Sequence, residues 1–256
     1  KHVPLMETVP EEAVKNNIFG TFNVATLAEK YKAKKFVMIS TDKAVNPTNV
    51  MGCSKRICEI YVQSLDKAIK DGKVNGDTEF ITTRFGNVLG SHGSVIPLFK
   101  EQIKNGGPVT VTDPNIVRFF MLIPEACKLV LEAGTKGHGG EIFVFDVGKA
   151  VKIVDLARRM IQLSGVDIDI KFTGLRDGEK LYEEVLNNKE TTLPTFHPKI
   201  KIAKVRMYDY VSVCKSIEEL VAHSYENDDM QIVKIMKNIV PEFKSQHSKY
   251  EVLDLC

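Results

Sequence analysis

Short apolar segments alternate with longer amphipathic ones along this chain, and the first clear pair constrains the fold most. The strand expected over residues 35–40 has a continuously apolar centre, 36–39 (F-V-M-I), which is typical of a buried strand in a parallel sheet. The polar run 40–43 (S-T-D-K) follows, and then a helix expected over 50–70 carries Met51 and Lys55 on one face. In open α/β sheets, ligands bind where parallel strands end, beside the next helix. The pattern therefore predicts an α/β fold with a site at the end of this strand.

The same alternation continues downstream. Apolar spacing predicts helices over residues 10–31, 50–70, 94–105, 124–133 and 153–164, and strands over 35–40, 79–84, 109–112, 141–146 and 168–172. From residue 187 onward the pattern weakens, and only residues 216–225 and 229–238 favour helices. The opening residues 1–7 fit a loop or the end of a strand. Strands that alternate with helices indicate βαβ units around a parallel sheet.

The nucleotide-binding half of such a sheet is not visible in the sequence. A doubly wound dinucleotide-binding sheet has about six strands and carries G-x-G-x-x-G after its first strand. Here three long core strands are found, and the glycine-rich run 137–140 precedes a strand instead of following one. The chain also begins with Lys1. We therefore expect a fragment: residues 1–105 form the C-terminal half of a Rossmann-type doubly wound domain, and residues 106–256 form mainly a smaller α/β substrate-binding region, with one further Rossmann strand near 141–146.

Charge and cysteine content exclude several classes of protein. The formal net charge of +2, with Lys and Arg scattered, argues against a nucleic-acid partner or an anionic membrane surface. The five cysteines show no C-x-x-C spacing and no His partner at metal spacing, which indicates reduced thiols, a cytoplasmic location and no structural metal. No apolar run reaches the ~18 residues that a membrane helix needs.

Four segments occur together, and their combination is more specific than any one of them. They are residues 36–52, 84–91 (R-F-G-N-V-L-G-S), 118–121 (R-F-F-M) and 174–181 (G-L-R-D-G-E-K-L). Together they resemble the signature of the capsular-polysaccharide-type nucleotide-sugar 4,6-dehydratases, which belong to the extended short-chain dehydrogenase/reductase superfamily. The resemblance runs from residue 1 to about residue 186. It implies that a glycine-rich NAD loop and the first four strands lie upstream.

The resemblance implies a reaction and a set of roles. UDP-N-acetylglucosamine would become a UDP-4-keto-6-deoxy sugar, with NAD (or NADP) taking hydride from C4 and returning it to C6. Asp42 would be the acid that protonates the departing 6-hydroxyl, and Lys43 would handle the C5 proton. Lys55 would hold the nicotinamide ribose and stabilise negative charge, and Thr41 would hydrogen-bond a sugar hydroxyl. The plain alternative is that the polar run only caps the next helix and that Lys55 is a solvated charge.

Met51 departs from the superfamily pattern, which places Tyr four residues before the helix Lys. A thioether cannot take a proton. The proton of the 4-hydroxyl would therefore leave by another route, through Thr41, a water molecule or Asp42. A long-chain branch of the family carries Met here, and its members have an N-terminal membrane region, so the parent protein could be anchored to the inner membrane. The plain alternative for Met51 is core packing.

Further site residues are expected on both sides of the catalytic pair. Asn17 and Ser40 are placed with Lys55 on the cofactor side, where the superfamily keeps a helix Asn that holds an active-site water. A solvated helix Asn is the alternative for Asn17.

On the substrate side, Asn87 would touch the nucleotide sugar, or it would be an ordinary turn residue. Arg118 and Arg176 are candidates for the diphosphate or ribose of UDP, because guanidinium donors match phosphate oxygens, or they are surface residues. Glu179 would orient a sugar hydroxyl or pair with Arg176, or it is a solvated loop carboxylate.

Two rival functions remain beside the dehydratase. A nucleotide-sugar epimerase or reductase of the same superfamily would use Tyr at position 51 and would lack the Asp42-Lys43 pair. A non-enzymatic regulatory or assembly module fits the missing NAD loop, and we expect the chain by itself to be inactive and not to bind NAD tightly. Because helices near 11–30 and 50–70 usually form a four-helix dimer interface in this superfamily, we also expect a homo-oligomer.

Overall fold

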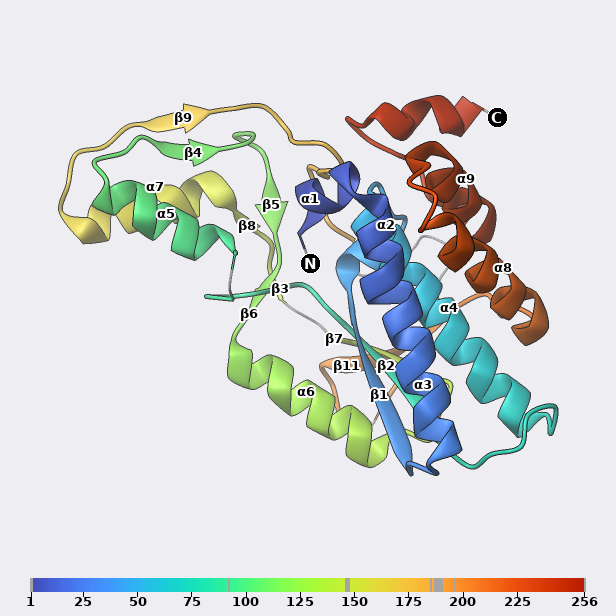
Figure 1. The fold of residues 1–256 in the computed structure, drawn as a ribbon. Coiled ribbons are helices and arrows are strands. Elements are labelled where there is room, and N and C mark those ends of the chain that lie inside the picture. Colours follow the sequence, from blue (N-terminus) through green and yellow to red (C-terminus); the bar gives the residue numbers. More distant parts are fainter. Residues whose placement is uncertain are drawn as a thin grey trace.

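Among the residues that the structure describes, five strands form the main sheet in the order β1-β2-β7-β11-β10 (Figure 1). The computed structural model describes residues 2–91, 93–145, 148–184, 186, 191–195 and 197–255. The strands are β1 (Lys35–Thr41), β2 (Glu79–Phe85), β7 (Ile142–Phe145), β10 (Thr191–Pro194) and β11 (Ile200–Lys204). The first three run parallel, whereas β11 and β10 add an antiparallel edge. The expected Rossmann-type parallel sheet is therefore confirmed.

Helices cover both faces of this sheet. The helices α3 (Gly20–Lys30) and α4 (Val50–Lys70) lie on one face, and α6 (Ile123–Lys136) lies on the other (Figure 1). Neighbouring residues of β2 point to opposite faces of the sheet: Phe80 belongs to the core beneath α4, and Ile81 belongs to the core beneath α6. Coverage on both faces explains the apolar runs in the centre of β1 and along β7.

The N-terminal segment is helical, so the expected loop or strand end over residues 1–7 is wrong. Helix α1 (Val3–Thr8) has a proline in its first turn, where the missing N–H costs nothing, and it packs against α4. After it come α2 (Pro10–Ala13), a π-helical segment η1 (Val14–Phe19) and α3. The helix predicted over 10–31 is thus present, with a wider turn in its middle.

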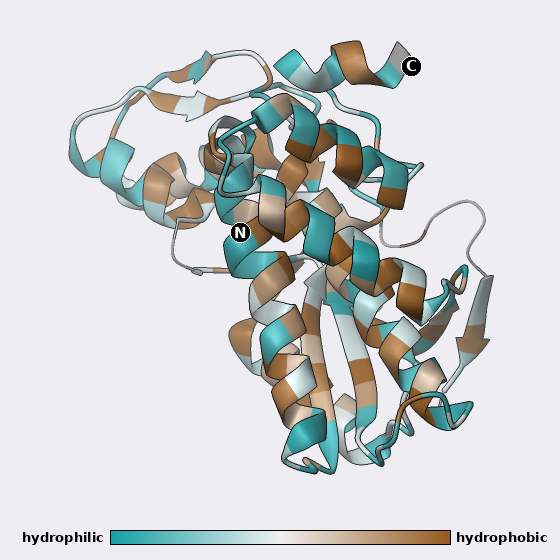
Figure 2. Cartoon of the chain, turned by 45° about the vertical axis from the view of Figure 1, so that its right-hand side comes forward, coloured by the Kyte–Doolittle hydropathy of each residue, from teal (hydrophilic) through white to brown (hydrophobic). Residues whose placement is uncertain are grey.

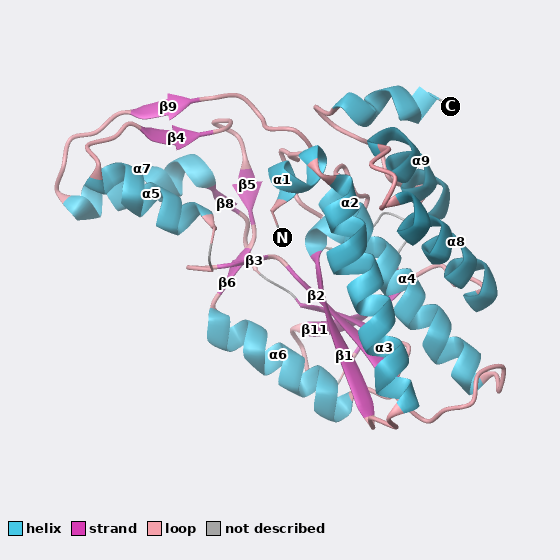
Figure 3. Ribbon diagram, viewed as in Figure 1, coloured by secondary structure: helices cyan, strands magenta, loops and turns pink. Residues whose placement is uncertain are grey.

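A smaller lobe stands beside the main sheet (Figure 3). It contains α5 (Val95–Lys104), α7 (Ile153–Ser164), the parallel pair β4 (Val109–Val111) and β9 (Ile170–Phe172), and the antiparallel pair β5 (Val117–Arg118) and β8 (Val151–Lys152). Phe99, Val111 and Ile153 are members of its separate hydrophobic core. The short parallel pair β3 (Asn87–Val88) and β6 (Phe120–Met121) connects this lobe to the main sheet.

The C-terminal helices return to the main sheet. Helices α8 (Tyr210–His223) and α9 (Asp229–Ile239) pack against α4, and the 3-10 segment η3 (Lys249–Leu255) follows them. Hydrophobic and hydrophilic residues alternate along the helices of the chain (Figure 2), and Ile217 and Leu220 of α8 and Ile232 and Met236 of α9 are buried in the core that includes α4. The division into residues 1–105 and 106–256 stays a prediction, but α6, β7, α8 and α9 beyond residue 105 belong to the main body. The predicted dimer surface also stays a prediction, and here α8 and α9 of the same chain cover α4.

Two further observations concern the strand expected over 141–146 and the length of the helices. The strand expected over 141–146 is β7, which ends at Phe145, and residue 146 lies outside the described residues. Within the described part of the chain, no helix is both long enough and apolar enough to span a bilayer.

Candidate active site

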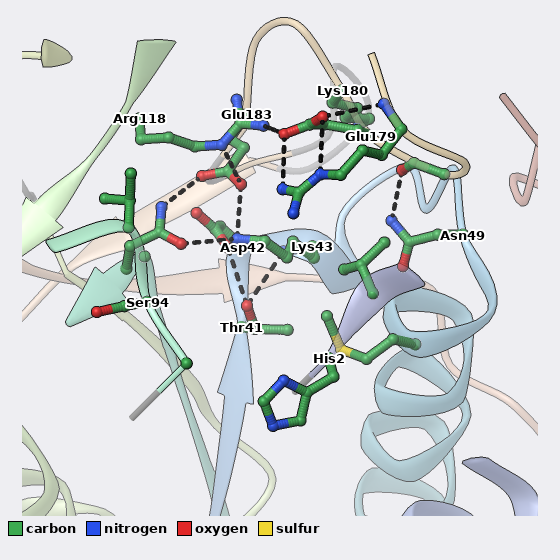
Figure 4. Close-up of a pocket in the computed structure, with 18 of the residues that line it drawn as sticks. His2, Thr41, Asp42, Lys43, Asn49, Ser94, Arg118, Glu179, Lys180 and Glu183 are labelled. Atoms are coloured by element: carbon green, nitrogen blue, oxygen red, sulfur yellow. Dashed lines mark hydrogen bonds and ion pairs between the residues drawn. The ribbon is translucent and has the colours of Figure 1, made fainter. Parts of the chain in front are cut away.

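A cavity of about 640 Å³ opens at the carboxyl ends of β1 and β2, between the main sheet and the smaller lobe (Figure 4). The two strands end side by side, because Ser40 pairs with Arg84 and Thr41 with Phe85 in the parallel register. All of the site residues expected from the sequence line this cavity: Asn17, Ser40, Thr41, Asp42, Lys43, Met51, Lys55, Asn87, Arg118, Arg176 and Glu179. The fold therefore brings together segments that lie far apart in the sequence.

The Asp42-Lys43 pair is held by a short turn at the end of β1. Residues 42–44 form the 3-10 helix η2 (Asp42–Ala44), and the Thr41 hydroxyl accepts a hydrogen bond from the Lys43 backbone N–H (3.4 Å) and donates to Asp42 Oδ1 (2.9 Å). Gly52 is required beside this turn, since a Cβ there would collide with the backbone carbonyl of Lys43. The start of α4 is thus packed directly against the turn η2.

The pair is a buried ion pair with one unsatisfied oxygen. Lys43 Nζ lies 3.1 Å from Asp42 Oδ1, and the Asp42 side chain has no solvent exposure. Asp42 Oδ2 is buried and has no hydrogen-bond partner among the described residues. Burial raises the pKa of Asp42 to about 6, opposed by Lys43 and reinforced by Glu183. Burial acts to lower the pKa of Lys43, but the carboxylates of Asp42 and Glu183 outweigh it and raise the pKa above its ordinary value.

Glu183 joins this pair to two further site residues. Its carboxylate lies 2.6 Å from Lys43 Nζ and 3.1 Å from Arg118 Nε, and it accepts a hydrogen bond from Asn87 Nδ2 (2.9 Å). The Asn87 amide oxygen in turn accepts from Lys43 Nζ (3.2 Å). Burial would raise the pKa of Glu183, but Lys43 and Arg118 hold it below its ordinary value.

The loop after β9 supplies Arg176 and Glu179. Glu179 bridges the two arginines, with Oε1 3.3 Å from Arg118 and 3.1 Å from Arg176. The expected pairing of Glu179 with Arg176 is therefore present. The Arg118 side chain is 12% exposed and already holds two carboxylates, whereas Arg176 is 57% exposed at the rim. Arg176 is thus the freer of the two for an anionic ligand.

The C-terminal segment holds this loop in place. The backbone N–H of Gly178 donates to the carbonyl of Gln246 (2.7 Å), and the N–H of Gln246 donates to the carbonyl of Thr48 (3.1 Å). The Thr48 hydroxyl closes the link by donating to the Gly178 carbonyl (3.0 Å). The part of the chain in which no motif is visible therefore shapes the site from behind.

The α4 side of the cavity carries Met51 and Lys55, one turn apart. Met51 is 3% exposed and Lys55 is half-buried. Asn17 lies in the π-helical segment, and its side-chain amide donates to the Ser54 hydroxyl (2.8 Å). The Asn17 backbone carbonyl accepts from the Cys58 thiol (3.1 Å).

Ser40 is committed to a different network. Its hydroxyl donates to Glu59 Oε1 (2.6 Å), and Glu59 also receives Arg84 Nε (2.8 Å) and Arg56 NH1 (2.9 Å). Glu59 and Arg84 have no solvent exposure. Burial would raise the pKa of Glu59, but Arg84 and Arg56 lower it to about 2. Ser40 therefore anchors the end of β1 to α4 and β2 through its hydroxyl.

Sequence reasoning missed Glu183, Glu59 and Ser94. Glu183 lies inside the resembling stretch, just after G-E-K-L, so its place there was the available signal. Ser94, at the start of α5, has a buried hydroxyl oxygen with no partner among the described residues, and it lines the cavity. Within the described part of the chain, no group of His, Cys, Asp and Glu could hold a metal ion.

Two curated relatives are similar to this chain over most of its length. It is 57% identical over 224 residues to "Capsular polysaccharide biosynthesis protein CapD" of Staphylococcus aureus, covering 86% of this chain and 36% of that protein. It is 41% identical over 190 residues to "UDP-glucose 4-epimerase" of Rickettsia rickettsii, covering 74% of this chain and 54% of that protein. The chain thus spans about a third to a half of the length of these relatives.

Two solved structures share the fold. Pen from Bacillus thuringiensis aligns with a TM-score of 0.73 and 38% identity, over 82% of this chain and 65% of that one. The dTDP-glucose 4,6-dehydratase of Bacillus anthracis in complex with NAD aligns with a TM-score of 0.56 and 22% identity, over 64% of this chain and 57% of that one, which shows the likeness of fold.

The sequence as a whole matches one protein family over most of its length. The matched residues are 1–205, and the family is described as "Polysaccharide biosynthesis protein". The match contains the turn η2, the start of α4 and the loop that carries Arg176 and Glu179. With the resemblance to CapD, it confirms the relationship expected from the four segments: this chain belongs to the polysaccharide biosynthesis protein family.

Proposed function

We propose that this chain carries the catalytic segment and the sugar-nucleotide side of an NAD-dependent UDP-N-acetylglucosamine 4,6-dehydratase that acts in surface-polysaccharide synthesis. One observation carries the proposal: the buried Asp42-Lys43 pair lies in a cavity with Met51 and Lys55. A dehydration needs an acid and a base close together, and adjacent groups of opposite charge supply both. The similarity to CapD and the family match support the placement in polysaccharide synthesis.

Each residue of the pair has a role that its surroundings favour. The Asp42 carboxyl gives its proton to the hydroxyl leaving C6, the C6–O bond breaks and water departs. The proton at C5 goes to Lys43 as the C5–H electron pair forms the C5=C6 double bond. Lys43 can accept the C5 proton only as a neutral amine, so the reactive form of the pair has its shared proton on Asp42, whose Oδ1 lies 3.1 Å from Nζ. In that form Asp42 is the acid and Lys43 is the base.

The residues on α4 fit a nicotinamide cofactor. The Lys55 ammonium offers donors for ribose hydroxyls, and the Met51 thioether offers an apolar contact for a planar ring. NAD, when bound, accepts the hydride from C4 of the sugar and returns it to C6. Because Met51 cannot accept the proton of the 4-hydroxyl, Thr41 and Asp42 remain as the protein groups that line the cavity and can pass it on.

The substrate side is proposed from the exposure and the pairing of its donors. Arg176, which is 57% exposed, is placed to meet the diphosphate of UDP, and Glu179 orients its guanidinium group by accepting from Nε and NH2. Arg118 and Asn87 are already bonded to buried carboxylates, so we assign them to the inner wall that faces the sugar.

The test is an assay of the full-length protein that contains this chain. Incubation with UDP-N-acetylglucosamine should give a product that has lost the mass of one water and carries a 4-keto group. A product of unchanged mass with inverted C4 would instead establish an epimerase. The Asp42→Asn variant should stop dehydration and still allow reduction of bound NAD by the sugar, because the asparagine amide cannot protonate the leaving hydroxyl.

A further inference from the structure

Among the described residues, the buried groups in contact with Lys43 and Arg118 include more carboxyls than there are cations to pair with them. Lys43 and Arg118, with side chains 20% and 12% exposed, face the carboxyls of Asp42, Glu179 and Glu183, whose side chains are at most 9% exposed. A buried carboxylate without a cation is costly, so a cluster of this composition favours the uptake of one proton. Arg176 pairs with Glu179 at the rim and is screened by solvent, and Lys180 pairs with Glu184 outside this cluster.

The hydrogen bonds indicate which carboxyl takes that proton. Glu183 receives three donors, from Lys43, Arg118 and Asn87, so its oxygens are satisfied as a carboxylate. Asp42 Oδ1 accepts hydrogen bonds from the Thr41 hydroxyl and from Lys43 Nζ. Asp42 Oδ2 is buried and has no hydrogen-bond donor among the described residues. A proton on Asp42 would turn this orphan oxygen into a donor, and the Glu183 carboxylate is its neighbour.

We propose that Glu183 is a positioning residue for the catalytic pair: its carboxylate orients Lys43 and Arg118 and thereby makes Asp42 the carboxyl that holds the proton. Glu183 itself transfers nothing to the sugar. It acts on Asp42 by sharing the Lys43 ammonium, which would otherwise hold Asp42 fully ionised. The groups that face Asp42 from the packed elements are Thr41 and Lys43 of the catalytic turn and Glu183 from the loop, with Arg118 of β5 behind them. The effect of Glu183 on the protonation of Asp42 does not depend on the proposed function. Only its expected effect on catalysis rests on the proposed dehydratase reaction.

The direct test follows the titration of Asp42 without any substrate. The 256-residue chain is labelled with ¹³C at aspartate carboxyls, and the Asp42 signal is identified by its loss in Asp42→Asn. The midpoint is expected near pH 6 in the unmodified chain and lower by about one pH unit or more in Glu183→Gln, because the neighbouring negative charge is gone. Glu183→Asp keeps the charge and should keep the midpoint within about half a unit. An unchanged midpoint in Glu183→Gln, or a midpoint near 4 in the unmodified chain, would overturn the proposal.

The activity test separates positioning from a merely structural role. In the full-length enzyme, Glu183→Gln should lower kcat by about tenfold or more, leave KM for the UDP-sugar within about threefold, and move the alkaline limb of the kcat profile to lower pH. A matched charge removal on the surface, Glu226→Gln, should change none of these. A rise in KM with an unshifted pH profile would contradict the proposal. If the unmodified enzyme makes no 4-keto product while the Asp42 titration behaves as expected, the proposed function fails and the role of Glu183 in the cluster stands.

Should Glu183→Gln fail to fold, Asp42→Asn gives a second measurement. An asparagine can donate from its amide to Glu183 as a protonated Asp42 would. The midpoint of thermal unfolding of the Asp42→Asn variant at pH 5 should therefore equal that of the unmodified chain within about two degrees. A large loss of stability in Asp42→Asn at that pH would show that Asp42 is ionised there, against the proposal.

Discussion

Replacing Glu59 by Gln should destabilise this protein far more than a surface substitution of the same kind. Glu59 is fully buried and is the shared acceptor for Arg84, Arg56 and the Ser40 hydroxyl. Glutamine keeps the size of the side chain but removes the negative charge, and it points an N–H₂ group at guanidinium donors. The fully buried Arg84 then has no compensating charge at that position.

Two independent arguments give a similar magnitude. The pKa of Glu59 falls from 4.5 to about 2 on folding, and at about 1.4 kcal/mol per pH unit this corresponds to roughly 3 kcal/mol of stability. Breaking a buried ion pair by removing one partner costs about 3–5 kcal/mol. We therefore expect Glu59→Gln to lower the free energy of unfolding by about 3 kcal/mol or more at neutral pH.

The dependence on pH follows from the direction of the shift. Because the folded state lowers the pKa of Glu59, its contribution is complete above pH 4.5 and is lost as the pH falls toward 2. Between neutral pH and about pH 3.5, the difference between the unmodified chain and Glu59→Gln should narrow by about 1–2 kcal/mol.

Urea unfolding followed by far-UV circular dichroism measures both effects. The chain contains no tryptophan, so backbone signal is the better probe. The variant should show a lower midpoint at an unchanged m-value. Glu226→Gln, which removes an exposed carboxylate paired with His223, is the matched control and should leave the midpoint unchanged. A Glu59→Gln midpoint as high as that of the control, or a difference that stays constant with pH, would refute this reasoning.

Three further predictions concern other parts of the fold. Leu220→Ala on α8 should cost about 2–5 kcal/mol in the same unfolding assay, because Leu220 is fully buried in the core with α4; a cost below about 1 kcal/mol would show that α8 is not packed there. Gly178→Ala should cost about 1–3 kcal/mol, since its φ is +74° and a new Cβ would lie 2.5 Å from the Cβ of Asn49; an unchanged midpoint would contradict that backbone geometry. In native buffer, the exposed thiol of Cys127 should react with a maleimide before Cys53, whose pKa burial raises, and peptide mass spectrometry that found the reverse order would contradict the burial pattern.

Local pattern was enough to predict the main helices and strands. Helix α4 has the predicted bounds, because Asn49 caps its first turn by accepting from the N–H of Gly52 (2.7 Å). The centre of strand β1, residues 36–39, is apolar, as expected for a sheet with helices on both faces. Strands β10 and β11 escaped prediction because both are short, because the edge strand β10 ends at Pro194, and because β11 carries exposed lysines.

The site could be predicted in part for a different reason. Strand ends and helix starts follow from local sequence, so Thr41, Asp42 and Lys55 could be placed in one cavity from their positions alone. The partners Glu183 and Glu59 could not, because their roles depend on contacts made across the fold. No local pattern distinguishes a buried carboxylate that receives three donors from a solvated one.

The packing of α8 and α9 on α4 determines where the chain can be shortened without exposing its hydrophobic core. The family match ends at residue 205, before either helix begins. A polypeptide that ends at residue 205 would expose the side of α4 that carries Ile57, Tyr61 and Leu65. A newly exposed hydrophobic patch of this kind promotes aggregation. A shortened polypeptide made for expression should therefore end beyond α9, so that both helices still cover α4, and not at residue 205, where the family match ends.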